Sequence, residues 1–404
     1  MESSIRVGLS GSTFCLFLIG SSVFAADQLI LLDGESVSAT IAEIKEDGRI
    51  IGENIPKGLD IDGLRRIDRD VQSSSVSDST PVVELVGGGR LHVRSVAIAD
   101  EQCVVGWAFG DDLNLSIDAV RYVKFDPKQA DNGFERAAEA PSAEFDRIFL
   151  EGGGKIQRLT GLIVELDSDQ ITFEWKGKEQ AFPRKNLFGI VFAQLAVGTS
   201  RESKSVVHLR DGSLLPSDIA SLSENVLKAK LSPTSSVALP WQSVSSIVVK
   251  SSRLAFMSDL EPVEQSQQSI VTLSKPWQRD RSIQGRPLTL RDPEQQSERV
   301  FTKGVGMHSL CRLGFDIGGR YDVFAATIGI DAETDSKGNC VYKVLGDGKE
   351  LYSQQVKGID APRELRLNVS GVDRLTLLVE PGEDLDLADH ADWCDARVIR
   401  NSKK

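Results

Sequence analysis

Residues 365–380, "LRLNVSGVDRLTLLVE", carry the clearest fold signal in the chain. The first part, "LRLNV", alternates apolar and polar residues, as a strand with one buried face does. The last part, "LTLLV", is continuously apolar, which is typical of a strand covered on both faces. The turn residues of "VSGVD" between them allow the chain to reverse. The stretch therefore predicts two antiparallel strands in a sandwich core.

The same pattern of strand-like runs and turn residues extends across the last third of the chain. Short strand-like runs alternate with turns such as "IGG" (317–319) and "GDGK" (346–349), and no long stretch with a helical period interrupts them. We expect residues 254–402 to form an antiparallel sandwich of two sheets. The predicted fold class is all-β.

Four weak repeats precede this region. An apolar run enters a Gly turn in "LLDGESV" (31–37), "LVGGGRL" (85–91), "LEGGGKI" (150–156) and "LRDGSLL" (209–215), and each unit closes on a short β-branched run. The matching glycines are Gly34, Gly88, Gly153 and Gly212. A glycine supplies the positive φ that such a turn requires.

These units predict about four small β-barrel-like repeats, at 26–70, 81–127, 145–195 and 203–250. Each resembles a small Sm-like or SH3-like barrel. Such barrels often bind RNA or peptides, but these lack a basic stripe with interleaved aromatic residues. We interpret them as scaffold or protein-contact modules. Residues 71–80 and 128–144 are polar enough to be linkers, although the second is also compatible with short helices.

The N-terminus predicts export. Arg6 precedes the apolar run "FCLFLIG" (14–20), and small residues follow at Val23 and Ala25, so residues 1–25 are expected to be a signal peptide. No later run reaches the roughly 18 apolar residues of a membrane span. The periplasm and the cell exterior both remain open. The chain has 404 residues and a net charge of −12, which argues against nucleic acid as a partner.

Cysteine usage excludes two common site types. Cys103, Cys311, Cys340 and Cys394 follow the signal peptide, and none forms a CxxC pair, which argues against zinc-ribbon and thioredoxin folds. Because exported proteins form disulfides, we expect one bridge among the last three. The sequence does not choose the pair.

An ordered set of motifs in the last third resembles a known family. The motifs are "WQRDRS" (277–282), "KGVGMHS" (303–309), "GGRYDVFAATIGID" (318–331), "DGKELYS" (347–353) and "DHADW" (389–393). Together they resemble the carbohydrate-binding module associated with glycoside hydrolase family 98 (NPCBM), over roughly residues 255–400. The resemblance implies a non-catalytic, galactose-binding-like jelly roll that is appended to secreted proteins. It also implies recognition of a terminal, galactose-type sugar, with calcium sometimes bound nearby.

Two groups of side chains are the candidate sugar contacts. In "DHADWCDARV" (389–398) a Trp ring can stack on a pyranose while His and Asp bond its hydroxyls. The alternative is that the Trp plugs the sandwich and the His residues satisfy loop backbone. The "WQRDR" group can grip hydroxyls, or its Arg residues can tie Asp280 and a sheet edge. The candidates are Trp277, Arg279, Arg281, His308, His390 and Trp393.

Carboxylates crowd the loop before the last strand, and hard cations bind carboxylate oxygens. The candidate calcium ligands are Asp384, Asp386, Asp389 and Asp392. The alternative is a solvated acidic loop, and no cofactor is required by the predicted function. "DAETDSKGN" (331–339) begins like an EF-hand loop but lacks Gly at the sixth position and the closing Glu, so we reject that motif.

No catalytic signature stands out. The sequence after residue 25 contains no HExxH, GxSxG or GxxxxGK[ST] motif, and the whole chain has only four His residues. We therefore predict an exported, non-enzymatic carbohydrate-binding protein whose repeats act as scaffold or bind a protein partner. The alternatives are an envelope assembly protein without sugar binding, and a glycoside hydrolase with a disguised catalytic region.

Overall fold

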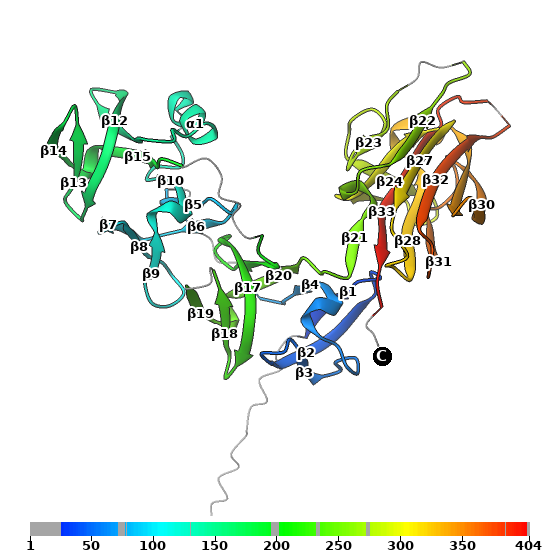
Figure 1. Cartoon of the computed structure of the whole chain (residues 1–404), viewed down its shortest axis with the longest axis horizontal. Coiled ribbons are helices and arrows are strands. Elements are labelled where there is room, and N and C mark those ends of the chain that lie inside the picture. The colour runs from blue at the N-terminus through cyan, green and yellow to red at the C-terminus, as the bar shows by residue number, and fades with distance from the viewer. Residues whose placement is uncertain are drawn as a thin grey trace, which may run out of the picture.

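The computed structural model describes residues 26–71, 77, 79–129, 131–194, 202–231, 235–271, 275–383 and 385–401. Within these ranges the chain is almost entirely β, with one α-helix, α1 (Asn132–Glu139). Figure 1 shows the C-terminal sandwich on one side of the molecule and a lobe of repeats on the other, joined by further repeats below. The expected signal peptide lies outside the described residues. No helix among the described residues is long and apolar enough to cross a bilayer.

The strands of the four repeats follow one another along the chain. The first repeat holds β1 (Asp27–Leu31), β2 (Ser36–Ile44), β3 (Ile50–Glu53) and β4 (Leu64–Asp68). The second holds β5 (Val82–Leu85), β6 (Arg90–His92), β7 (Ser95–Ala99), β8 (Gln102–Gly106), β9 (Leu113–Ser116) and β10 (Val120–Lys124). The third holds β11 (Asp146–Gly152), β12 (Lys155–Leu166), β13 (Gln170–Trp175), β14 (Lys178–Pro183) and β15 (Leu187–Val191). The fourth holds β16 (Ser205–Leu209), β17 (Leu214–Ser223), β18 (Val226–Lys230), β19 (Ser236–Pro240) and β20 (Val244–Val249).

Each repeat closes on itself, because its first strand pairs with its last: β1 with β4, β5 with β10, β11 with β15 and β16 with β20. A single 3-10 turn precedes every closing strand. The turn glycines Gly34, Gly88, Gly153 and Gly212 all have positive φ, between 60° and 94°, as predicted. The expectation of small β-barrel-like repeats is confirmed.

The repeats associate in a nested order that the sequence did not reveal. The closing strand β4 of the first repeat pairs with β20 of the fourth, and β10 of the second pairs with β15 of the third. A further contact joins each pair, Ile44 of β2 opposite Leu222 of β17 in one and Ile98 of β7 opposite Leu166 of β12 in the other. Pairing covers edges that would otherwise be open to aggregation. The first and fourth repeats therefore form one unit and the two middle repeats another.

The segment 128–144 is more than a linker. Asp131 caps α1 by accepting a hydrogen bond from the Phe134 N–H at 2.7 Å. Phe134 is fully buried and its ring makes edge contacts with Phe149 and Phe188. The polar composition of the segment concealed this single aromatic anchor. Most of 71–80, the other predicted linker, lies outside the described residues.

The C-terminal third forms the predicted sandwich of two sheets. One sheet runs β23 (Gln278–Arg279), β26 (Gly304–His308), β33 (His390–Ile399), β28 (Val323–Ile330) and β31 (Arg363–Asn368), with β21 (Leu254–Phe256) also paired to β33. The other runs β22 (Glu264–Gln267), β27 (Cys311–Asp316), β32 (Arg374–Pro381), β29 (Asn339–Gly346) and β30 (Lys349–Lys357). A hairpin, β24 (Leu288–Asp292) and β25 (Ser297–Phe301), covers part of the first sheet. The fold-class prediction is confirmed.

The expected disulfide is wrong. Cys311 and Cys394 carry free, buried thiols, so neither bridges to the other or to Cys340. Cys311 lies in the core between the sheets, whereas Cys394 packs under the β24–β25 hairpin on the other face of its sheet. Burial raises the pKa of the Cys311 thiol to about 12, which keeps it protonated. These cysteines act as small apolar core residues.

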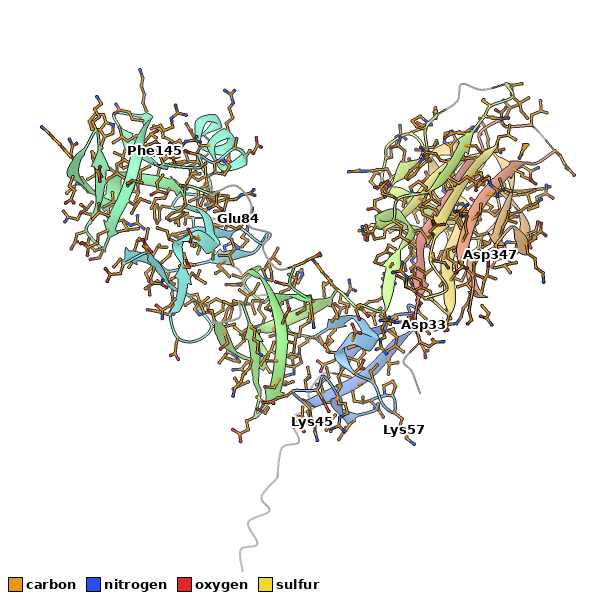
Figure 2. The ribbon with its side chains drawn as sticks, in the orientation of Figure 1. Asp33, Lys45, Lys57, Glu84, Phe145 and Asp347 are labelled. Carbon is orange, nitrogen blue, oxygen red and sulfur yellow. The ribbon has the colours of Figure 1, made fainter. Side chains whose placement is uncertain are left out.

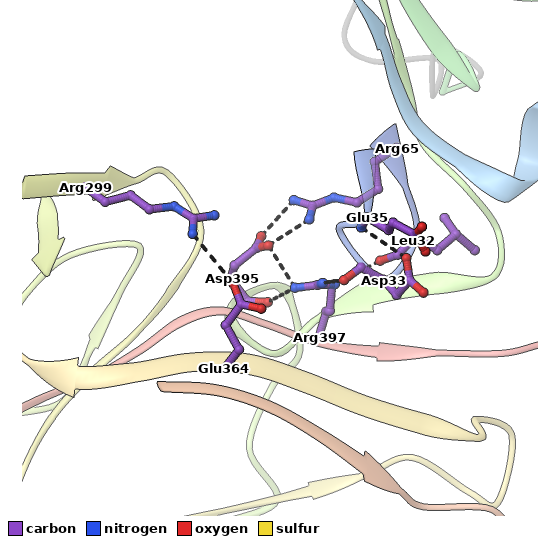
Figure 3. Close-up of polar contacts among 8 residues, drawn as sticks. All are labelled: Leu32, Asp33, Glu35, Arg65, Arg299, Glu364, Asp395 and Arg397. Carbon is purple, nitrogen blue, oxygen red and sulfur yellow. Dashed lines mark hydrogen bonds and ion pairs between the residues drawn. The ribbon is translucent and has the colours of Figure 1, made fainter. Parts of the chain in front are cut away.

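The sandwich is joined firmly to the first repeat. Arg65 of β4 donates two hydrogen bonds of 2.7 Å to the Asp395 carboxylate on β33, as Figure 3 shows. Arg397 donates to the same carboxylate at 2.8 Å and to the backbone carbonyls of Leu32 and Asp33. The Leu32 side chain packs against Ala325 and Ile399 beside this network. Ionic and apolar contacts thus fix the sandwich against the repeat.

Candidate functional site

The candidate site lies at the end of the sandwich where β26 ends and β33 begins. His308 and His390 are direct partners across these two strands, and their ring centroids are 5.9 Å apart. They are 3% and 8% exposed. The structure therefore brings together two of the predicted contacts, although their sequence positions differ by more than 80 residues.

Glu333 completes this cluster. Its Oε1 lies 2.8 Å from His390 Nδ1, and its Oε2 accepts a 2.7 Å hydrogen bond from the Ser282 hydroxyl. Burial alone would raise the pKa of Glu333, but the bonds from His390 and Ser282 outweigh burial and lower that pKa. The ionised carboxylate orients the His390 ring. Glu333 and Ser282 are not among the predicted contacts, and Glu333 stands in the rejected loop motif "DAETDSKGN" (331–339).

The cluster suits recognition of hydroxyl groups. A neutral imidazole offers one donor and one acceptor, which matches the two roles of a sugar hydroxyl. Burial, followed by the nearby charge of His390, lowers the pKa of His308 and favours the neutral ring at pH 7. Arg281 is exposed and directly precedes Ser282 in the chain, so its guanidinium is a further available donor.

The lowered pKa of His308 predicts a loss of stability in acid. Because folding favours the neutral ring, its stabilising contribution is complete above the ordinary imidazole pKa of about 6.5 and is lost as the pH falls below it. The charges of His390 and Lys275 also oppose protonation of His308, whereas a backbone hydrogen bond with Ser309 and the charge of Asp386 favour it. We expect a His308 ring NMR titration midpoint below 6.5, and a flatter curve of Tm against pH for His308→Gln. A midpoint at or above 6.5 would contradict this expectation.

Trp393 does not belong to the site. Its side chain is fully buried between the sheets, 5.0 Å from the Tyr342 ring and 6.3 Å from the Phe324 ring, measured between centroids. Sugar stacking requires an open face, so this prediction is corrected in favour of the core alternative. Because β33 is covered on both faces, its sequence lacks the alternation of polar and apolar residues that would show which way Trp393 points.

The residues of the "WQRDR" group have different surroundings in the structure. Arg279 donates to the carbonyls of Ser258 and Leu260 and pairs with Glu261 at 2.7 Å. It is therefore committed to the sheet edge, which was the alternative weighed for it. Trp277 is half-buried and its Nε1 donates to Gln265 at 3.0 Å. Since β23 pairs with β26, Trp277 lies beside the strand that carries His308.

The three predicted calcium ligands that the structure describes, Asp386, Asp389 and Asp392, form no ion-binding group. Asp386 accepts hydrogen bonds from the Ser269 hydroxyl and the N–H groups of Ile270 and Val271, at 2.8–3.0 Å, and so ties two loops together. Asp389 accepts from the Asn339 N–H at 2.9 Å. Burial, followed by the neighbouring Asp331, raises the pKa of Asp392 well above its usual range. Asp384 lies outside the described residues.

The metal prediction is thus corrected for the part of the chain that the structure covers. There, no group of three or more His, Cys, Asp or Glu side chains is placed to hold an ion. The acids serve instead to organise loop backbone and to fill the interior. A sequence count of carboxylates cannot distinguish these uses, because it contains no information on which way each side chain points.

The C-terminal sandwich is similar to a known class of domain. Residues 253–399 match the model of the NPCBM/NEW2 domain, which confirms the resemblance found in the sequence. A protein of Renibacterium salmoninarum described as "Putative endo-alpha-N-acetylgalactosaminidase" is 31% identical over 101 residues. That match covers 25% of this chain and 7% of the relative, so the chain spans a small part of that protein.

Solved structures of carbohydrate-binding modules are also similar. A CBM51 module from a GH95 protein of Clostridium perfringens, in complex with methyl-galactose, is 23% identical with a TM-score of 0.33. That likeness covers 36% of this chain and 99% of the module. The tandem CBM51 modules of a family 98 glycoside hydrolase from Streptococcus pneumoniae are 14% identical with a TM-score of 0.32, over 93% of this chain and 88% of theirs.

Proposed function

We propose that this protein is exported and binds a glycan, without catalysing a reaction, through the loop end of its C-terminal sandwich. The match of residues 253–399 to the NPCBM/NEW2 domain supports sugar binding. The convergence of His308, Glu333 and His390 at one end supports the place of binding. We assign Arg281 and Trp277 to the same end, and Ser282, which is fully buried, to the support of Glu333 behind it. Trp393 and Arg279 support the fold behind it.

The repeats carry this module rather than bind sugar at that site. We propose the division into modules at 26–70, 81–127, 145–195, 203–250 and 254–402 as the working domain map. The contact of Arg65 with Asp395 supports a fixed attachment of the first repeat to the sandwich. Export to the periplasm or cell exterior is part of the proposal and is supported by residues 1–25 of the sequence.

A glycan array probed with the full chain tests the proposal. We expect retention of galactose-type or N-acetylhexosamine-terminated glycans, and binding that is about 10–100-fold weaker in His390→Ala. The loss follows because a charge-assisted hydrogen-bonding partner is worth about 1.5–3 kcal/mol. His208→Ala, in β16 of the fourth repeat, is the matched control and should bind normally.

Two other outcomes would decide against the proposal. Folded protein that retains no glycan, with or without added calcium, would favour an assembly role for the sandwich. The buried contact with the first repeat is the observation that favours that second candidate, because it shows the sandwich packing against protein. Release of reducing sugar that is abolished by one carboxylate substitution would favour a glycoside hydrolase.

A further inference from the structure

The two pairs of repeats can be compared position by position. In the fourth repeat Asp218 of β17 faces Lys230 of β18, and in the third Leu162 of β12 faces Glu174 of β13. When Asp218 is matched to Leu162, Leu222 is matched to Leu166. The contacts between repeats, Leu222–Ile44 and Leu166–Ile98, then fall at equivalent positions. Positions in the first-and-fourth pair thus have defined equivalents in the middle pair, which serves as an internal reference for what the fold requires.

A cleft lies between the first and fourth repeats. Its volume is about 740 Å³, and residues 46–48 and 61–62 of the first repeat form one wall. The other side comes from β17, from β18 and from the two ends of the fourth repeat, residues 204–205, 249–250 and 252. In Figure 1 the fourth repeat lies next to β2 and β3. Four exposed lysines line the cleft: Lys204, Lys228, Lys230 and Lys250.

Two of the acidic residues of the cleft pair with arginines outside its lining. Asp47 pairs with Arg49 of its own hairpin at 2.7 Å. Asp62 accepts two hydrogen bonds from Ser252, at 2.9 and 3.0 Å. Asp218 accepts from the Lys204 N–H at 2.8 Å. Asp62 also pairs with Arg253 at 3.5 Å. Because Arg49 and Arg253 offset Asp47 and Asp62 from outside the lining, the four lysines face the remaining carboxylates of Glu46 and Asp218.

Within the part of the chain that the structure describes, only one of the four lysines forms an ion pair. Lys250 pairs with Glu202 at 2.8 Å. Lys204, Lys228 and Lys230 make no ion pair within 4.0 Å with any residue that the structure describes. Lys228 and Lys230 are two residues apart on β18, so they point to the same face about 7 Å apart. On a chain of net charge −12, this is a local cationic patch against an acidic background.

The fold does not require these lysines. Their equivalents in the third repeat are Phe145, Thr172, Glu174 and Ala193. The corresponding surface there has none of these lysines and exposes apolar side chains: Phe145, Leu162 and Val164 are 45%, 43% and 43% exposed, and Phe145 is labelled in Figure 2. The same backbone accommodates both surfaces, so the lysine side chains are free to serve a ligand.

We propose that this cleft binds an acidic saccharide segment, through the carboxylate or sulfate groups of its sugars. Lysine is a compact point charge on a flexible stem, which accommodates anions of varied geometry. The cleft has no aromatic lining residue on which a nucleobase would stack, and this argues against single-stranded nucleic acid. The inference goes beyond the proposed function, because it places a second, charge-dependent ligand site on the repeats.

Binding of the full chain to polygalacturonate and to dextran sulfate, measured by isothermal titration calorimetry, tests the proposal and separates the two anion sources. We expect binding to at least one of them, no binding to neutral dextran, and weakening as salt is raised. The double substitution Lys228→Gln and Lys230→Gln is expected to weaken binding about tenfold. The control, Lys178→Gln with Lys185→Gln in the third repeat, changes the net charge equally and should bind like the wild type.

Three results would overturn the inference: no binding to either polyanion, equal weakening by the control pair, or tighter binding to single-stranded DNA than to both saccharides. His390→Ala separates this site from the one on the sandwich. We expect that variant to retain polyanion binding in full, even if the sandwich proves to bind no sugar. The two proposals therefore fail independently.

Discussion

Trp393→Ala is expected to destabilise the protein by about 3–5 kcal/mol, because it removes the largest side chain from the interior of the sandwich. The ring contacts Tyr342 and Phe324 and is fully buried, so the neighbours cannot collapse into the space without moving both sheets. Urea unfolding followed by far-UV circular dichroism measures the loss as a lower midpoint for the sandwich transition.

Trp393→Phe keeps the experiment informative should the alanine variant fail to fold. It retains an apolar ring in nearly the same place, and we expect a smaller cost, about 1–2 kcal/mol. Glycan binding should survive in this variant. If binding disappeared while the unfolding midpoint stayed unchanged, the ring would have to contact sugar, and its assignment to the core would be wrong.

Asp395→Ala is expected to cost about 2–3 kcal/mol and to loosen the sandwich from the first repeat. The substitution leaves Arg65 and Arg397 close together without their shared carboxylate. Breaking a fully buried ion pair costs about 3–5 kcal/mol, and here the Arg65 and Asp395 side chains are still 24% and 17% exposed. Small-angle X-ray scattering should show a broader distribution of interatomic distances, alongside a lower unfolding midpoint.

The control for that experiment is Asp68→Ala. Asp68 pairs with Arg66 on the same strand as Arg65, but the Arg66 and Asp68 side chains are 51% and 35% exposed, so the pair should contribute less than about 1 kcal/mol. Equal effects of the two substitutions on stability and on scattering would show that the Asp395 network does not hold the junction.

The elements that were predictable from sequence are those encoded by neighbouring residues. The turn glycines depend on the local backbone conformation, and the strands of "LRLNV" and "LTLLV" depend on the pattern of apolar residues along a few positions. Both appear where expected. The pairing of Ile67 with Ile247, and of Val123 with Ile190, could not be predicted. All four closing strands are similar β-branched runs, so the choice of partner depends on the arrangement of the whole chain.

The site was partly predictable for the same reason. His308 and His390 were predicted because they stand in recognisable motifs. Glu333 contacts His390 from a turn after β28, and no pattern in its neighbouring residues indicates this contact. Asp386 and Asp389 looked like ion ligands because sequence shows composition but not direction. In the structure they bond to loop backbone, as buried acids with nearby N–H groups tend to do.

Strand β33 begins at His390, in the candidate glycan site, and ends at Ile399, which packs on the first repeat. It is bonded to β26 and β21 on one side and to β28 on the other. Backbone hydrogen bonds in antiparallel sheets lie across the strands. A force on a bound ligand, opposed by the attachment to the repeats, would act along β33. It would therefore load the hydrogen bonds to the neighbouring strands in shear and at the same time, and a sheet resists force best in that direction.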